Sequence, residues 1–317
     1  MARILITGAT GFVGGWLVDE LRSQLPDAVL FGTTHSANGT EIPGVTLLPC
    51  DITNPEAVRS VVRTADPTHV VHLAGIASAA GGNADTLRAV NADAATTLLE
   101  AVAALGDNRR VLLASSGYVY GATTPGNPAA ETDPLNAIGA YAESKAAMEE
   151  AAQTFCANES NAHVSVVLAR AFNHTGARQT DAFVVPAFAK QIAQIERGEL
   201  DPVVKVGNLS ALRDFLHVAD VVRAYRLLLD ADLPEPVTVV NVASGVGVSI
   251  RSMLDELVAL SGADVTVETD PARLRPSDLP ECVGDYGKLN RLTGWMPTHS
   301  LTQTLRETLD YWRGQTA

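Results

Sequence analysis

The feature that most constrains this chain stands near its beginning, where a short apolar run leads into three spaced glycines. Residues 3–7 are rich in branched apolar side chains, which is typical of a buried parallel strand. Gly8, Gly11 and Gly14 follow at intervals of three, and an apolar helical pattern begins at Phe12. In a strand–turn–helix unit such glycines permit a tight turn, a close approach of backbone to a pyrophosphate, and close packing of helix on strand. The stretch therefore predicts a dinucleotide site at a helix N-terminus. Its expected cofactor contacts are Gly8, Gly11, Phe12, Val13 and Gly14.

Strand-like and helical segments alternate along the first half of the chain. Further apolar runs lie near residues 28–32, 45–48, 69–74, 110–114 and 164–169. This alternation predicts an α/β fold with a Rossmann-type doubly wound parallel sheet, which binds ligands at the carboxyl ends of its strands. Beyond residue 170 the alternation weakens. Helical segments are expected at 183–197, 218–230, 249–261 and 300–313, with short strands near 203–206, 238–242 and 265–268.

These patterns predict two domains. We expect a dinucleotide-binding domain over residues 1–170, with residues 210–245 interleaved back into it. A smaller, partly interleaved C-terminal substrate domain is expected over residues 171–209 and 246–317.

The residues that end the second strand bear on the cofactor. Sheets of this class usually place an acidic residue there to bind the ribose hydroxyls of NAD. The chain has Thr33, Thr34 and His35 instead. Small hydroxyls and a histidine suit a 2′-phosphate better, so NADP(H) is favoured and NAD(H) is the alternative. Asp51, after the third strand, is placed to bond the adenine amino group. The other expected cofactor contacts are Thr34, His35, Ile52, Leu73, Ala74, Gly75 and Asn91.

Tyr141 and Lys145 are four residues apart on a predicted helix over 140–157, so their side chains share one face. A nearby ammonium stabilises a phenolate and should lower the pKa of the tyrosine towards neutrality, as an acid or base requires. Ser116, at the end of the fifth strand, can bond the same substrate oxygen. We therefore predict Ser116, Tyr141 and Lys145 as catalytic residues for hydride transfer between a nicotinamide and a carbonyl, with Tyr141 and Lys145 also holding the cofactor. An ordinary helix-surface pair is the alternative explanation.

Composition narrows the class of protein. A formal net charge of −13 argues against a general binder of nucleic acid or anionic membranes. No apolar run approaches the ~20 residues of a membrane span, and no secretory signal precedes the first strand. The three cysteines form neither a zinc spacing nor a disulfide framework, and the seven histidines are scattered. We expect a cytoplasmic protein without a metal.

The chain resembles the extended short-chain dehydrogenase/reductase family over essentially its whole length. The motifs that carry this resemblance are the glycine turn, the run Ser-Ser-Gly-Tyr-Val-Tyr-Gly at 115–121 and the Tyr141/Lys145 pair. The segments 170–176, 213–218 and 275–278 resemble its nucleotide-sugar branch, and most of all the GDP-4-keto-6-deoxy-D-mannose reductases. The resemblance implies that Asn173, Arg213 and Arg275 contact the phosphates of a sugar nucleotide, a role that suits a guanidinium. For Arg213 an ion pair with Asp214 or Asp220 is the alternative. The remaining implied contacts are Phe172 for the cofactor and Ser78, Ser116, Gly117 and Tyr118 for the substrate.

One departure from the family separates two reactions. Related 4,6-dehydratases carry a carboxylate shortly after the catalytic hydroxyl residue, where this chain has Gly117 and Tyr118. The resemblance therefore implies an oxidoreductase of deoxysugar biosynthesis that reduces the C4 ketone of a nucleotide-linked 4-keto-6-deoxyhexose, giving GDP-D-rhamnose from GDP-4-keto-6-deoxy-D-mannose. A nucleotide-sugar 4-epimerase with tightly bound NAD is the main alternative, and a 4,6-dehydratase or a non-catalytic dinucleotide sensor ranks lower. Relatives also imply a homodimer through the Ala-rich helices predicted over 85–105 and 140–157.

Overall fold

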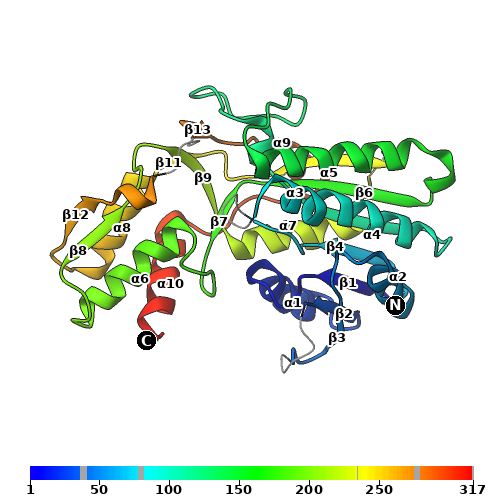
Figure 1. The fold of residues 1–317 in the computed structure, drawn as a ribbon, viewed down its shortest axis with the longest axis horizontal. Coiled ribbons are helices and arrows are strands. Elements are labelled where there is room, and N and C mark those ends of the chain that lie inside the picture. The colour runs from blue at the N-terminus through cyan, green and yellow to red at the C-terminus, as the bar shows by residue number, and fades with distance from the viewer. Residues whose placement is uncertain (36–40, 78–81, 234, 275–278, 316–317) are drawn as a thin grey trace.

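The computed structural model describes residues 1–35, 41–77, 82–233, 235–274 and 279–315. A seven-stranded sheet with helices on both faces makes up one lobe, and two smaller sheets with three helices make up the other (Figure 1).

The large sheet is built from parallel strands. They are β1 (Arg3–Thr7), β2 (Val29–Thr34), β3 (Val45–Pro49), β4 (His69–His72), β5 (Arg109–Ser116), β6 (Val164–Ala171) and β10 (Val237–Val242). Their order is β10-β6-β5-β4-β1-β2-β3, and every neighbouring pair is parallel. The order reverses between β1 and β4, which is the point where open α/β sheets bind ligands. The predicted doubly wound sheet is confirmed.

Alternating side chains bury both faces of this sheet. Ile4 and Ile6 of β1 point into a core with α1 (Phe12–Gln24) and α7 (Val218–Asp230). Leu5, between them, points into the opposite core, which includes side chains of three helices: α2 (Pro55–Ala65), α4 (Ala94–Ala103) and α5 (Ala140–Ala157). Strands buried on both sides read as continuous apolar runs, which is why the sequence identified them.

The helix predicted over 85–105 is not continuous. It consists of α3 (Ala84–Arg88), a π-helical turn (Ala89–Asp93) and α4. The extra residue in such a turn changes the phase of the helix, and Asn91 within it is only 1% exposed. This break turns Asn91 towards the loop after β4 and towards α5, where it forms hydrogen bonds.

Within the described residues, the second lobe has six short strands and three helices. They are β7 (Asn173–Thr175), β8 (Val203–Val206), β9 (Leu212–His217), β11 (Gly247–Ser249), β12 (Thr266–Thr269), β13 (Glu281–Cys282), α6 (Val184–Glu196), α8 (Ile250–Ser261) and α10 (Leu301–Arg313). Strand β9 lies between β11 and β13 and also pairs with β7, while β12 pairs with β8. The three helices share an apolar core.

The chain crosses between the lobes more than once. Within the range 210–245, β9 belongs to the small sheet, whereas α7 and β10 belong to the large lobe. Further on, α9 (Gly287–Thr293) and the fully buried Trp295 return to the core of the large lobe. In the parts of the chain that the structure describes, no helix combines the length and apolar character needed to cross a bilayer.

Candidate active site

The glycine turn after β1 forms a cradle made of backbone. The Gly11 amide donates to the Gly8 carbonyl oxygen at 3.0 Å, and Gly8 donates its own amide to the Thr33 hydroxyl at 3.1 Å. A Cβ on Gly14 would collide with the Gly8 carbonyl oxygen and would lie 2.8 Å from the Ala9 Cα. Gly11 caps α1 and offers no side chain to its first amides. This arrangement fits a dinucleotide, whose phosphates would bind the amides at the start of α1.

The predicted adenosine end lies at the carboxyl ends of β2 and β3. Thr34 is half-buried and His35 is exposed, and no carboxylate stands at either position. Asp51 accepts hydrogen bonds from the amide and hydroxyl of Thr53, at 2.9 and 2.7 Å. These bonds hold the pKa of Asp51 below its usual value, and His35 nearby contributes in the same direction. Ile52, the residue after Asp51, is half-buried.

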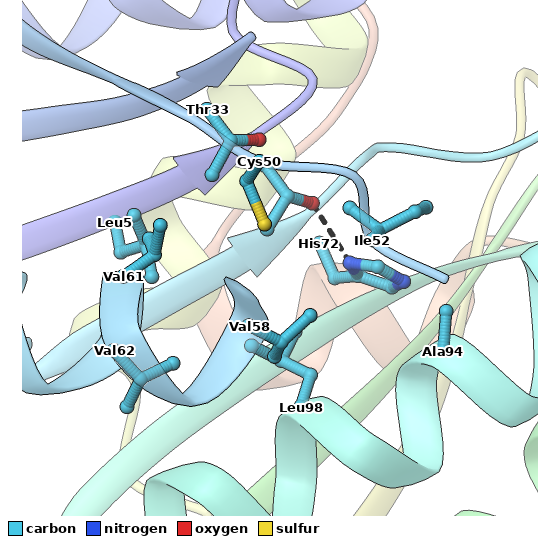
Figure 2. Close-up of a pocket in the computed structure, with 11 residues that line it drawn as sticks. Leu5, Thr33, Cys50, Ile52, Val58, Val61, Val62, His72, Ala94 and Leu98 are labelled. Carbon is cyan, nitrogen blue, oxygen red and sulfur yellow. Dashed lines mark hydrogen bonds between the residues drawn. The ribbon is translucent and has the colours of Figure 1, made fainter. Parts of the chain in front are cut away.

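A small apolar cavity of about 10 Å³ lies behind this end (Figure 2). His72 reaches it from β4, and its Nδ1 is 2.7 Å from the Thr7 hydroxyl. Burial lowers the pKa of His72 to about 3, so the ring is neutral. The cavity is far too small for a cofactor, and His72 is a packed core residue.

The loop after β4 passes close to the catalytic helix. Ala74 donates its amide to the Thr7 hydroxyl at 3.1 Å. Asn91 exchanges hydrogen bonds with the backbone of Ile76, at 2.9 and 3.1 Å, and donates to the Ser144 hydroxyl at 3.0 Å. Asn91 thereby braces the loop that contains Leu73, Ala74 and Gly75 against α5. Its predicted contact with the cofactor remains a prediction.

Ser116, Tyr141 and Lys145 come together where β5 ends. The Ser116 hydroxyl hydrogen-bonds that of Tyr141, and Lys145 donates from Nζ to the Ala114 carbonyl oxygen at 2.8 Å. Tyr118 packs edge-to-face against Tyr141, with 6.4 Å between ring centroids. Ser116 and Lys145 are buried, and Tyr141 is half-buried.

The predicted lowering of the Tyr141 pKa is wrong for this structure. Burial raises the pKa of the phenol, the hydrogen bond with Ser116 opposes that rise, and Tyr118 adds to it. The ammonium of Lys145 is directed at a backbone carbonyl. Burial lowers the pKa of Lys145 to about 8, and the charge of Glu149 acts against this shift.

The turn that follows Ser116 holds the residues predicted to contact the substrate. Gly117 lies against the ring of Phe172, where an added Cβ would be 2.7 Å from three ring carbons. Arg213 donates from Nε to the Tyr118 hydroxyl at 3.2 Å. Asn173 starts β7 and is half-buried. Asp214 and Asp220, offered as partners for Arg213, instead bond to groups such as Ser244 and Thr298.

Three predicted residues need separate comment. Phe172 is only 2% exposed, its amide donates to Val242, and its carbonyl oxygen bonds to His174. It therefore packs inside the protein, and its predicted contact with the cofactor remains a prediction. Ser78 and Arg275 lie outside the described residues.

A buried polar network next to the predicted catalytic residues was not itself predicted. Glu149 accepts hydrogen bonds from Ser115 and Arg170, and Arg170 also donates to the Tyr120 hydroxyl at 2.7 Å. Tyr120 in turn donates to Asn241 at 2.8 Å. A signal was present in the sequence, because Glu149 stands four residues after Lys145 on the same helix face.

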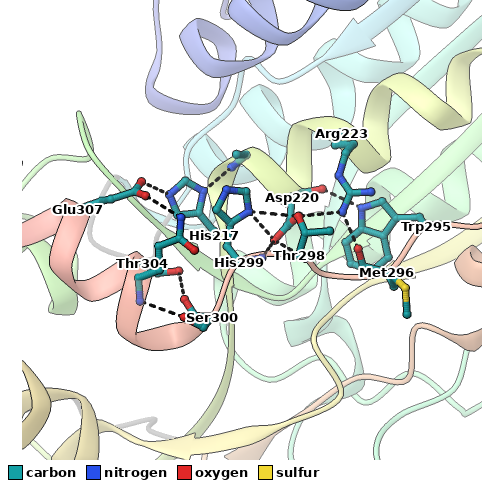
Figure 3. A network of polar contacts seen from close by, with 12 residues as sticks. His217, Asp220, Arg223, Trp295, Met296, Thr298, His299, Ser300, Thr304 and Glu307 are labelled. Atoms are coloured by element: carbon teal, nitrogen blue, oxygen red, sulfur yellow. Dashed lines mark hydrogen bonds and ion pairs between the residues drawn. The ribbon is translucent and has the colours of Figure 1, made fainter.

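A second polar cluster joins the lobes at the start of α7 (Figure 3). His217 caps this helix through Nδ1, and its Nε2 lies 3.0 Å from a carboxylate oxygen of Glu307 on α10. His217 stacks on His299 with 4.3 Å between centroids, and Asp220 bonds to both His299 and Arg223. The hydrogen bonds of this cluster link α7, the segment before α10, and α10 itself. In the described residues, no group of three His, Cys, Asp or Glu is arranged to hold a metal ion.

Known proteins resemble this chain along almost its full length. A family model described as GDP-mannose 4,6 dehydratase matches residues 5–308. GDP-6-deoxy-D-mannose reductase from Pseudomonas aeruginosa is 32% identical over 320 residues, which cover 99% of this chain and 98% of that protein.

Solved structures agree with this result. RMD from Pseudomonas aeruginosa complexed with NADPH superimposes with a TM-score of 0.83 at 29% identity, over 99% of both chains. UDP-glucose 4-epimerase from Thermus thermophilus in complex with NAD superimposes with a TM-score of 0.86 at 30% identity, over 99% of this chain and 100% of that one. The sequence match, the glycine turn after β1 and the Ser116, Tyr141 and Lys145 group at the end of β5 lead to one conclusion. The chain belongs to the GDP-mannose 4,6-dehydratase family, a group of NAD(P)-dependent nucleotide-sugar enzymes with the extended short-chain dehydrogenase/reductase fold.

Proposed function

We propose that the protein reduces the C4 ketone of GDP-4-keto-6-deoxy-D-mannose to GDP-D-rhamnose with NADPH. The observation that carries this proposal is the pairing of a Ser116–Tyr141–Lys145 group with a substrate turn that lacks a carboxylate at Gly117 and Tyr118. The similarity to a GDP-6-deoxy-D-mannose reductase supports both the base and the sugar.

The residues of the site have distinct roles in this reaction. When bound, NADPH supplies the hydride to the carbonyl carbon. Ser116 orients the ketone oxygen, and Tyr141 donates its phenolic proton to that oxygen as negative charge develops there. Burial raises the pKa of Tyr141, so the phenol carries its proton at neutral pH, as a proton donor must. Lys145 would hold the cofactor ribose with its ammonium.

The surroundings of Gly117 argue against a 4,6-dehydratase. Elimination needs an acid or base near C5 and the 6-hydroxyl, and the Phe172 ring leaves no room for a carboxylate side chain at position 117. Tyr118 has a phenol rather than a carboxylate and is held by Arg213. The chain is therefore related to the 4,6-dehydratases that give the family its name, but the reaction that we propose for it is a reduction.

NADPH is the proposed cofactor because the end of β2 lacks an acidic residue. Thr34 and His35 stand where a carboxylate would bind the ribose of NAD and repel a 2′-phosphate. The NADPH complex of the structurally similar RMD supports this choice.

A 4-epimerase is the second candidate, supported by the fit to the Thermus epimerase. An epimerase retains its cofactor between half-reactions, whereas a reductase releases the oxidised form at each turnover. Heating the purified protein and identifying any nucleotide set free distinguishes them, since stoichiometric NAD would favour the epimerase. A non-catalytic sensor, the third candidate, would need none of Ser116, Tyr141 and Lys145.

We also propose a cytoplasmic homodimer. Ala146 and Ala147 on α5 line a groove of the described surface together with Gln153, and small side chains allow a second helix to approach closely. Sedimentation that finds only monomer at working concentrations would contradict the dimer.

The proposed reaction is tested by offering GDP-4-keto-6-deoxy-D-mannose with NADPH or with NADH. We expect loss of reduced cofactor, faster with NADPH, and a product whose C4 configuration is that of GDP-D-rhamnose by NMR. Failure of the ketosugar to oxidise either cofactor would contradict the proposal.

A further inference from the structure

We propose that Glu149 is a positioning residue of this active site, whose buried carboxylate is the counter-charge that holds the Lys145 ammonium at the end of β5. The proposal rests on the proposed function for its catalytic consequence, although its electrostatic part can be measured without any substrate.

The last three residues of β5 each bind one member of a row on α5. Tyr141, Lys145 and Glu149 stand at intervals of four along this helix and so share a face. The Ser116 hydroxyl bonds to Tyr141, and the Ala114 carbonyl oxygen accepts from Lys145 at 2.8 Å. The third contact, from the Ser115 hydroxyl to the Glu149 carboxylate, is 2.5 Å long. Glu149 is therefore part of the same strand–helix contact as the two catalytic side chains.

The carboxylate of Glu149 is buried and paired with a buried arginine. Its residue is 1% exposed, and Arg170 donates to it from Nε at 3.0 and 3.1 Å and from Nη2 at 2.6 Å. Arg170 also lies over the Tyr120 ring, with its Cζ 4.8 Å from the centroid. Bidentate pairing of this kind stabilises a buried carboxylate in its charged form.

The groups around Lys145 explain why a counter-charge is needed. Lys145 is buried, and burial alone disfavours its ammonium. Tyr141 and Glu149 lie one turn before and one turn after it on α5, and His72 of β4 is near enough to interact with its charge. His72 is neutral, Tyr141 has a raised pKa, and Arg170 of β6 is paired with Glu149 itself, so the charge of Glu149 is the one that favours the ammonium.

The direct test is the pKa of Lys145 in the purified full-length protein. The chain has four lysines, so a titration of side-chain ¹³Cε and ¹⁵Nζ resonances can be assigned with the Lys145→Arg variant. In the wild type we expect a pKa of about 8. In Glu149→Gln it should fall by about 1 unit or more, because the attraction of the carboxylate is lost while Arg170 remains charged. Glu159→Gln, the same change at an exposed residue just after α5, should leave it unchanged.

Two further variants separate this role from a structural one. Arg170→Lys disturbs the bidentate packing but keeps both charges, so it should lower the melting temperature and leave the Lys145 pKa near its wild-type value. Glu149→Gln leaves a buried arginine unpaired and can fail to fold. The neutral pair Glu149→Gln with Arg170→Gln avoids that penalty and should still lower the Lys145 pKa, by less than the single change.

Turnover gives the second readout. In Glu149→Gln the pH at which kcat falls on the alkaline side should move down together with the Lys145 pKa. A Lys145 pKa that stays at its wild-type value in the folded Glu149 variants would overturn the proposal and make the pair a purely structural one. A lowered pKa in a protein that reduces no ketosugar would support the role of Glu149 while removing the proposed function.

Discussion

Two regions of the candidate active site differ in what lines them. The predicted cofactor wall, Gly8 to Gly14 after β1, consists of backbone held close by the absence of side chains. The predicted catalytic wall, the end of β5 and the row on α5, consists of buried polar side chains whose charges and protons depend on one another. A substitution among the glycines should therefore act by steric collision and weaken cofactor binding. A substitution among the polar side chains should act through charge and lower the rate of the reaction.

The largest expected effect is on the catalytic wall. Tyr141→Phe removes the proton donor and should lower kcat by about 10³-fold, within the usual range for a general acid. The affinity for NADPH, measured by fluorescence titration, should stay within a few-fold of the wild type because the glycine cradle is untouched. Loss of cofactor binding in this variant would mean that the tyrosine is structural, and the two walls would then not be separable.

The matching change on the cofactor wall is Gly14→Ala. Its Cβ would collide with the Gly8 carbonyl oxygen, and forcing such a contact commonly costs about 1–3 kcal/mol, so NADPH should bind roughly tenfold or more weakly. Gly15→Ala is the control, because its nearest neighbour is the flexible guanidinium of Arg178 at 3.6 Å. Equal effects of the two changes on the NADPH dissociation constant would argue against a steric cradle.

Tyr118→Phe should have a smaller and more selective effect. It removes the hydroxyl that accepts from Arg213 at 3.2 Å, a hydrogen bond to a charged group worth about 1.5–3 kcal/mol. We expect kcat/KM for the sugar nucleotide to fall about tenfold or more, with the NADPH dissociation constant unchanged. Tyr311→Phe on α10, far from the site, is the control. If Tyr118→Phe weakened NADPH binding instead, Tyr118 would belong to the cofactor wall.

The smallest effect concerns the alkaline limb of the pH profile. The pKa of Lys145 is lowered from 10.5 to about 8, so the ammonium is present below pH 8 and is lost as the pH rises through that value. Because the proposed role of Lys145 requires its charge, kcat should begin to fall near pH 8 rather than near pH 10.5. A profile that stayed flat up to pH 10 would show that the reaction does not need the ammonium.

The sequence revealed the cofactor wall more fully than the catalytic one, for a physical reason. Glycine spacing next to a strand and a helix is a local pattern, so the turn, the large sheet and the position of Ser116 could all be predicted. Interactions between distant residues leave no such local pattern. Strand β9 pairs with segments far from it in sequence, and Glu149 is bonded by residues of β5 and β6.

The error on Tyr141 has the same origin. Its spacing to Lys145 was correctly interpreted as a shared helix face, but its pKa depends on burial, which spacing does not give. The direction of the Lys145 side chain depends on the Ala114 carbonyl, which belongs to another element.

If this site carries out net reduction, as we propose, the stoichiometry of the reaction should show it. Purified protein is given GDP-4-keto-6-deoxy-D-mannose and excess NADPH, and the amount of NADPH oxidised is compared with the amount of ketosugar consumed. We expect one NADPH to be oxidised for each ketosugar reduced, and Tyr141→Phe to be inactive under the same conditions. Conversion of a sugar nucleotide without net oxidation of NADPH would contradict it and favour an epimerase.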